Sequence, residues 1–186
     1  LLLYNILTML NNENDNAYFP FDIYKNEKWD IEHITSITDT IPKQKNSWLN
    51  DAKVFIDVSK EDGKKLKNRA DTCDCEDDVE FEVLFKDIVK HFNSYLEDED
   101  INDISNLALL DSETNRGYKN AVFPLKRKTI IDREKKGIFI PICTKNVFLK
   151  YFSSYPPKIS FWTLEDRENY YKDLEKVLKD YVEKEI

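Results

Sequence analysis

The chain has 186 residues, of which 41% are apolar and 34% charged, so it can bury the core of one domain beneath an extensive solvated surface. No apolar run approaches the roughly 20 residues of a membrane span, and Leu1-Leu2-Leu3 lacks the basic leader and cleavage site of a signal peptide. Three cysteines do not make a disulfide framework, which favours a reducing compartment. The net charge of −8 argues against nucleic acid as a partner, unless the charge is unevenly distributed.

The first part of the chain predicts helical structure followed by a strand. Leu1–Leu10 is apolar nearly all round, as expected of a helix buried against other helices. Because the chain opens inside this helix without Met, we expect it to be the C-terminal part of a longer protein; a natural start trimmed by processing is the alternative. Residues 1–28 are then a helical lead-in. The alternation from Trp29 to Ile34 predicts a half-buried strand.

The middle of the chain is strongly acidic. Residues 71–103 contain thirteen Asp or Glu against two Lys, and apolar side chains recur there at helical spacing from about Val79 to Leu96. We interpret this block as an acidic helical insertion. Residues 59–69 are basic and contain Gly63, which predicts a loop or a poor helix. Residues 104–110 read as a short buried strand.

The remainder predicts helices. Ser112 is a plausible N-cap for a short helix. Pro124 suits the first turn of a helix that runs to about Lys136 and ends at Gly137. Further helices are expected from Thr144 to Phe152 and from a capping box at Thr163-x-x-Asp166 to the end of the chain. The fold class is therefore α+β: one mostly helical domain with a small β element.

Four residues could support hydrolysis of a phosphodiester bond. A neutral His can take a proton from water, and His33 is one of only two histidines. A divalent metal held by hard oxygen ligands can neutralise phosphate charge and stabilise the leaving oxygen, and Glu32 supplies such an oxygen. The side-chain amides of Asn106 and Asn115 can hold an imidazole in one tautomer or ligate Mg²⁺.

Together these residues resemble HNH (His-Me finger, ββα-metal) endonucleases: Glu-His-Ile, later Asn-Leu-x-Leu-Leu, then Asn-Arg-Gly before a basic helix. The second half is similar to the HNH domain of RNA-guided CRISPR nucleases, in which two asparagines also lie nine residues apart before Arg-Gly. Over nearly its whole length the chain resembles the C-terminal HNH domain of GmrSD-type modification-dependent restriction endonucleases. The supporting stretches are Phe19-Pro20-Phe21-Asp22, Trp29-x-x-Glu32-His33-Ile34, Asn120-x-x-Phe123-x-x-Lys126 and Phe139-Ile140-Pro141 before Thr144-Lys145-Asn146-Val147-Phe148.

The resemblance implies a role for each residue of the pattern. His33 would be the general base, Asn106 would orient its imidazole, and Glu32 and Asn115 would bind Mg²⁺ or Mn²⁺. Adjacent strand residues point to opposite faces, so Glu32 can share a site with His33 only if the strand ends or bulges there, and Asp30 is a possible substitute. The family usually has Pro-Gln shortly after His-Ile, whereas this chain has Thr35-Ser36, which predicts a remodelled loop.

The resemblance also implies an organisation and partners. Residues 29–136 would hold the ββα-metal core and the acidic insertion, and residues 137–186 the C-terminal helices. The implied location is the bacterial cytoplasm, and the implied role is restriction of phage or modified DNA. The implied partner is an N-terminal ParB-like, nucleotide-hydrolysing domain of the same protein. The basic segment 116–136 would bind the phosphate backbone of double-stranded DNA. The candidate contacts in that segment are Arg116, Lys119, Asn120, Lys126, Arg127 and Lys128.

Plainer interpretations remain open. A lone His on a strand is more often structural than catalytic, and the basic segment could be a solvated helix face. The protein could be a degenerate HNH fold that only binds nucleic acid or its own N-terminal domain, or a helical interaction module whose match is accidental. His91 fits surface or packing, and the spacing of Cys73, Cys75 and Cys143 does not fit a zinc site.

Overall fold

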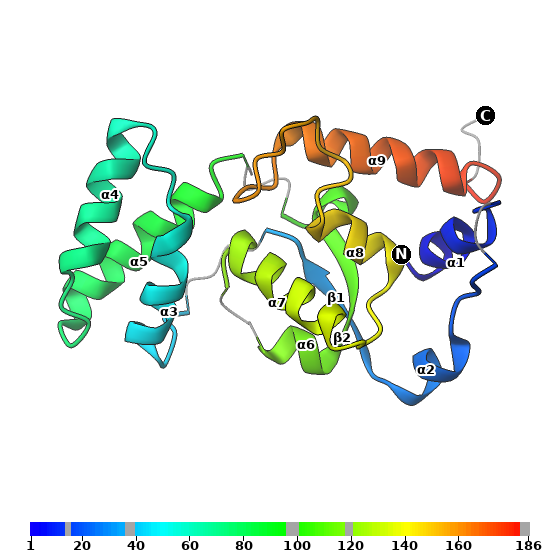
Figure 1. Ribbon diagram of the computed structural model, residues 1–186, viewed down its shortest axis with the longest axis horizontal. Helices are drawn as coiled ribbons and strands as arrows, with labels where there is room; N and C mark the ends of the chain where they lie inside the picture. Colours follow the sequence, from blue (N-terminus) through cyan, green and yellow to red (C-terminus); the bar gives the residue numbers. More distant parts are fainter. Residues whose placement is uncertain (14–15, 36–39, 96–100, 118–120, 183–186) are drawn as a thin grey trace.

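The computed structural model describes residues 1–186 except 14–15, 36–39, 96–100, 118–120 and 183–186. The described residues form a mostly helical fold with one two-stranded antiparallel sheet, as the α+β prediction expects. Figure 1 shows the sheet near the middle, covered by the later helices, with a separate helical group on one side and α1 and α2 on the other. No helix among the described residues is both long and apolar enough to cross a membrane.

The sheet pairs residues that lie far apart in the sequence. Strand β1 (Trp29–His33) runs antiparallel to β2 (Leu107–Asp111), with Trp29 opposite Asp111 and His33 opposite Leu107. Strand β2 is followed directly by α6 (Ser112–Gly117). The unit β1, β2, α6 is therefore built from two segments of the chain, and the whole acidic insertion lies between them. A 3₁₀ turn, η3 (Ile104–Asn106), occupies the start of the strand expected over 104–110.

The main core lies between this sheet and the C-terminal helices. Helix α7 (Phe123–Lys135) has Pro124 in its first turn and is followed by Gly137 at a φ of 73°, which only glycine adopts readily. Helix α8 (Ile142–Phe148) is tied to β2 because the Thr144 hydroxyl donates to the Leu109 carbonyl at 2.6 Å. Helix α9 (Leu164–Leu178) begins at the predicted capping box, and Tyr170 donates to the Leu107 carbonyl at 3.1 Å.

A second hydrophobic core belongs to the helical group. It is built by α3 (Lys45–Ala52), η1 (Lys53–Phe55), α4 (Glu61–Thr72) and α5 (Asp78–Phe92), around Trp48, Phe81 and Phe85. Residues expected as a loop or poor helix form the regular α4, because Leu66 and Ala70 pack into this core. The acidic insertion contributes α5, whose cap is Asp77.

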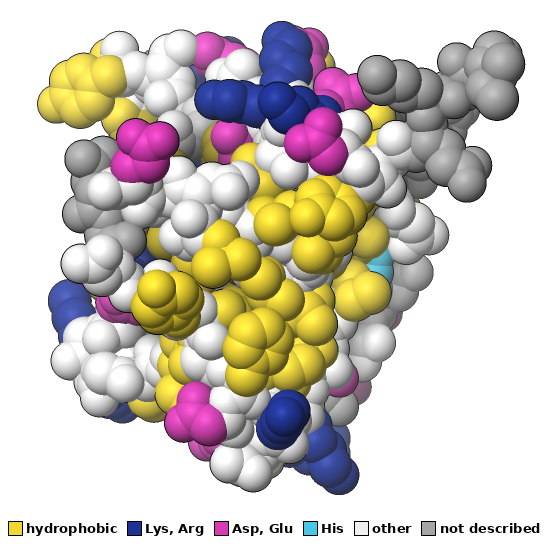
Figure 2. All heavy atoms as spheres, turned by 90° about the vertical axis from the view of Figure 1, so that its right-hand side faces the viewer, with side chains coloured by type: hydrophobic (Ala, Val, Ile, Leu, Met, Phe, Trp, Pro, Cys, Tyr) yellow, Lys and Arg dark blue, Asp and Glu magenta, His cyan; other side chains and the backbone are white. Residues whose placement is uncertain are grey.

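The N-terminal elements leave apolar surface exposed. Helix α1 (Leu2–Leu10) packs on α8 and α9 through Tyr4, and α2 (Phe21–Asn26) precedes β1. Figure 2 shows a broad apolar area on the side of the molecule where α1 and α2 lie. Exposed apolar residues from this part of the chain are Leu3, Leu10, Tyr18, Phe21 and Ile23.

Candidate active site

The candidate site is assembled at β1, β2 and α6. His33 is the last residue of β1, and its side chain is half-buried, with access to solvent. Its Nε2 lies 3.0 Å from Oδ1 of Asn102. When the neutral imidazole donates its Nε2–H to this amide oxygen, Nδ1 keeps the lone pair that a general base needs.

Asn106 is fully buried and holds the backbone that follows His33. Its Oδ1 accepts from the Thr35 amide at 2.9 Å, and its Nδ2 donates to the carbonyls of Thr35 at 2.8 Å and Ile101 at 2.9 Å. The Asn106 carbonyl also accepts from the Ile34 amide at 2.8 Å. Asn106 therefore positions His33 through the backbone, whereas the hydrogen bond to the imidazole comes from Asn102.

Asn115 reaches β1 from α6. Its Nδ2 donates to Oδ2 of Asp30 at 3.2 Å. The helix is held against the strands by Asp111, whose carboxylate accepts from the Thr114 amide at 2.8 Å and the Thr114 hydroxyl at 2.6 Å. This local cap explains why α6 starts directly after β2, and it brings an amide and a carboxylate together on the Asp30 face of β1.

Glu32 shares that face of β1, but its partner is a lysine. The Glu32 side chain is 12% exposed and forms an ion pair with Lys126 of α7, which is 0% exposed. The Lys126 ammonium also donates to the His33 carbonyl at 2.6 Å. Burial lowers the pKa of Lys126, while the neighbouring Glu32 opposes that shift. Glu32, which the sequence predicts as a metal ligand, is thus paired with an internal ammonium group.

The metal ligands predicted from the sequence are only partly brought together. Strand alternation places Asp30 and Glu32 on one face of β1 and the His33 side chain on the other. Among the described residues no group of three or more His, Cys, Asp or Glu side chains could hold a metal. Asp30 and Asn115 supply hard oxygen atoms, which suit Mg²⁺ because this ion keeps several waters and needs few protein ligands.

The predicted DNA contacts fall into three groups. Arg116 and Lys128 are exposed, and Arg127 is half-buried. Lys126 has no exposed side-chain surface, so in this arrangement it contacts Glu32 and cannot reach a phosphate. Lys119 and Asn120 lie outside the described residues. Of the four predicted cations that the structure describes, two are therefore exposed, one is half-buried and one is internal.

No family model, no curated protein and no solved structure matches the chain. The HNH resemblance therefore remains a prediction based on the residues themselves. Sequence reasoning missed two contributors to the site, Asn102 and the Glu32–Lys126 pair. Asn102 is not part of the motif, so the sequence does not predict its contact with His33. Lys126 lies among other basic residues, and nothing in the local sequence predicts that its side chain is buried.

Proposed function

We propose that the protein is a metal-dependent DNA endonuclease in which His33 activates the attacking water. The observation that carries the proposal is the order β1, β2, α6 with a solvent-accessible imidazole at the end of β1 and Asn106 fixing the backbone beside it. Asn102 holds the ring so that Nδ1 accepts the proton of the water. General-base catalysis of this kind typically accelerates a reaction by about 10²- to 10⁴-fold.

The metal belongs to the proposal as well. Asp30 and Asn115 would hold Mg²⁺ or Mn²⁺, which supplies positive charge to stabilise the charge that develops on the phosphate. They lie on the face of β1 opposite the His33 side chain, so the metal and the imidazole would act on one phosphate only at the end of the strand, which β1 reaches at His33. Lys126 holds Glu32 and the His33 carbonyl in place, so its role is positioning. Arg116 and Lys128, both exposed, would contact the DNA backbone. The family resemblance adds double-stranded DNA, including modified phage DNA, as substrate, the bacterial cytoplasm as location and an N-terminal ParB-like domain as partner.

A second function is favoured by one observation. The internal Lys126 ammonium already neutralises Glu32, as expected of an HNH-like fold that has lost metal-dependent cleavage and only binds nucleic acid or a protein partner. The two functions differ in whether cleavage occurs at all, so a single assay separates them.

The test is relaxation of supercoiled plasmid by the purified chain in Mg²⁺ or Mn²⁺. Wild type should nick the plasmid, EDTA should stop the reaction, and His33→Ala should lower the rate about 10²-fold or more. Asp30→Asn should raise the metal concentration needed. Asp51→Asn, which changes an exposed carboxylate on α3, is the matched control and should behave as wild type. Equal inertness of wild type and His33→Ala, with DNA still shifted in a gel, would establish the binding function instead.

A further inference from the structure

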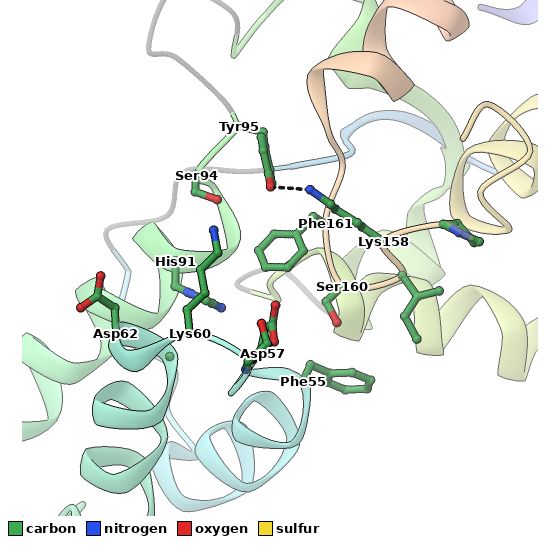
Figure 3. Close-up of a pocket in the computed structure, with 14 residues that line it drawn as sticks. Phe55, Asp57, Lys60, Asp62, His91, Ser94, Tyr95, Lys158, Ser160 and Phe161 are labelled. Atoms are coloured by element: carbon green, nitrogen blue, oxygen red, sulfur yellow. Dashed lines mark hydrogen bonds between the residues drawn. The ribbon is translucent and has the colours of Figure 1, made fainter. Parts of the chain in front are cut away.

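A pocket of about 710 Å³ lies away from the candidate active site, between the helical group and the C-terminal segment. One wall comes from the start of α4 and the end of α5, and the other from residues 157–161. Figure 3 shows side chains from both walls gathered around this space. The volume falls within the range of pockets that bind small molecules, which is about 300–1,000 Å³.

His91 contributes a rigid ring to the pocket wall. Its Nε2 is buried and has no hydrogen-bond partner among the described residues. The ring is held edge-on against Phe92 at 5.1 Å and Phe161 at 5.4 Å between ring centroids, so the imidazole is fixed by packing. A buried polar atom without a partner is unfavourable unless something else completes its hydrogen bond. Nε2 has almost no accessible surface, so a ligand in the pocket would contact the exposed edge of the ring, and a buried water is the partner that can complete the hydrogen bond of Nε2.

The other lining residues narrow the class of ligand. Aromatic rings from Tyr95 and Phe161 meet at 5.6 Å and offer apolar surface to a flat ring. Lys158 donates to the Tyr95 hydroxyl at 3.1 Å, and Lys60 lines the opposite wall.

Two carboxylates oppose the lysines. Asp57 and Asp62 also line the pocket, so its charges are nearly balanced, which disfavours a ligand with many negative charges. Carboxylates do, however, accept hydrogen bonds from exocyclic amines, which adenine, cytosine and guanine carry and uracil and thymine lack. The lining therefore fits a flat, amino-bearing heterocycle that carries a single phosphate.

We propose that this pocket binds one nucleotide unit, with an amino-bearing base against Phe161 and His91 and its phosphate near Lys60 and Lys158. The proposal does not depend on the nuclease function, because the pocket shares no residue with the site around His33. The unit could be a free nucleoside monophosphate or one nucleotide of a single strand. Both present the same base and phosphate.

The test follows the His91 ring by NMR. The chain has two histidines, so His33→Gln assigns both sets of ring signals. AMP and CMP should shift the His91 signals, whereas UMP, adenosine and inorganic phosphate should bind about tenfold or more weakly, since each lacks one charged or hydrogen-bonded contact. A short oligo(dA), titrated alongside AMP, assigns the source: tighter binding of the oligonucleotide indicates a strand, and tighter binding of AMP a free nucleotide.

Variants test the assigned contacts. Lys158→Gln changes an exposed side chain, so the fold should survive, and it should weaken AMP binding about tenfold. Lys65→Gln, an exposed lysine on α4 outside the pocket, is the matched control and should bind as wild type. The proposal is overturned if millimolar AMP and CMP leave the His91 signals unmoved, if phosphate alone shifts them equally, or if only the His33 signals respond.

Discussion

Replacing Lys126 by Met tests whether the internal ion pair supports the candidate site. Methionine keeps much of the apolar stem and removes the ammonium, so the change isolates the charge. It leaves the Glu32 carboxylate, 12% exposed, without its counter-charge, and it removes the donor at 2.6 Å from the His33 carbonyl. Loss of one partner from a buried pair typically costs about 3–5 kcal/mol.

We therefore expect Lys126→Met to lower the free energy of unfolding by about 3–5 kcal/mol. For a chain of this length that corresponds to a fall in Tm of about 6–20 °C. The double variant Glu32→Gln with Lys126→Met removes both charges and should recover at least about 2 kcal/mol of that loss, because no unpaired charge stays buried. Lys128→Met, an exposed lysine on the same helix paired with Asp132 at 3.2 Å, is the control and should cost less than about 1 kcal/mol.

Urea unfolding followed by circular dichroism measures all four proteins. A Lys126→Met effect no larger than that of Lys128→Met would refute the reasoning, as would a double variant no more stable than Lys126→Met. Mg²⁺ adds a second readout: if the freed Glu32 carboxylate can bind a cation, millimolar Mg²⁺ should raise the Tm of Lys126→Met more than that of wild type.

Four further predictions concern buried or tightly packed residues and their neighbours. Gly63→Ala should destabilise the helical group by at least about 2 kcal/mol, since its Cβ would lie 1.8 Å from the Asp57 carbonyl oxygen; thermal unfolding measures this. Asn106→Ala should lower the free energy of unfolding by about 2–4 kcal/mol and slow plasmid nicking, because it leaves the buried Thr35 amide unpaired. Unchanged urea unfolding together with unchanged nicking would contradict this prediction. Burial lowers the pKa of His91 below 6.5, so the unfolded chain takes up the proton first and stability should fall as pH drops below about 6.5. Asp57→Asn removes the carboxylate that opposes this shift, so an NMR titration should find the His91 pKa lower still.

Short-range signals in the sequence were sufficient to predict where several helices begin or end. Thr163 and Asp166 form the reciprocal cap that starts α9, and Gly137 takes the positive φ after α7. Such features depend on residues three or four positions apart, which is why spacing alone reveals them. The limits of α8 were predicted less well: a helix was expected from Thr144 to Phe152, but α8 ends at Phe148, and Lys150 has a φ of 67°. The buried pair of Lys150 with Asp166 accompanies this turn, and its partners are sixteen residues apart.

For the candidate site, the sequence determined which chemical groups are available: one imidazole on a strand, two amides further on and a run of cations. Only the tertiary structure decided their partners. It joined Asn106 to Thr35, Asn115 to Asp30 and Lys126 to Glu32, the last across ninety-four residues. Which cation becomes internal depends on how α7 packs against β1, because a buried carboxylate requires a charge of opposite sign within reach. That packing is a property of the whole fold, and no window along the chain contains it.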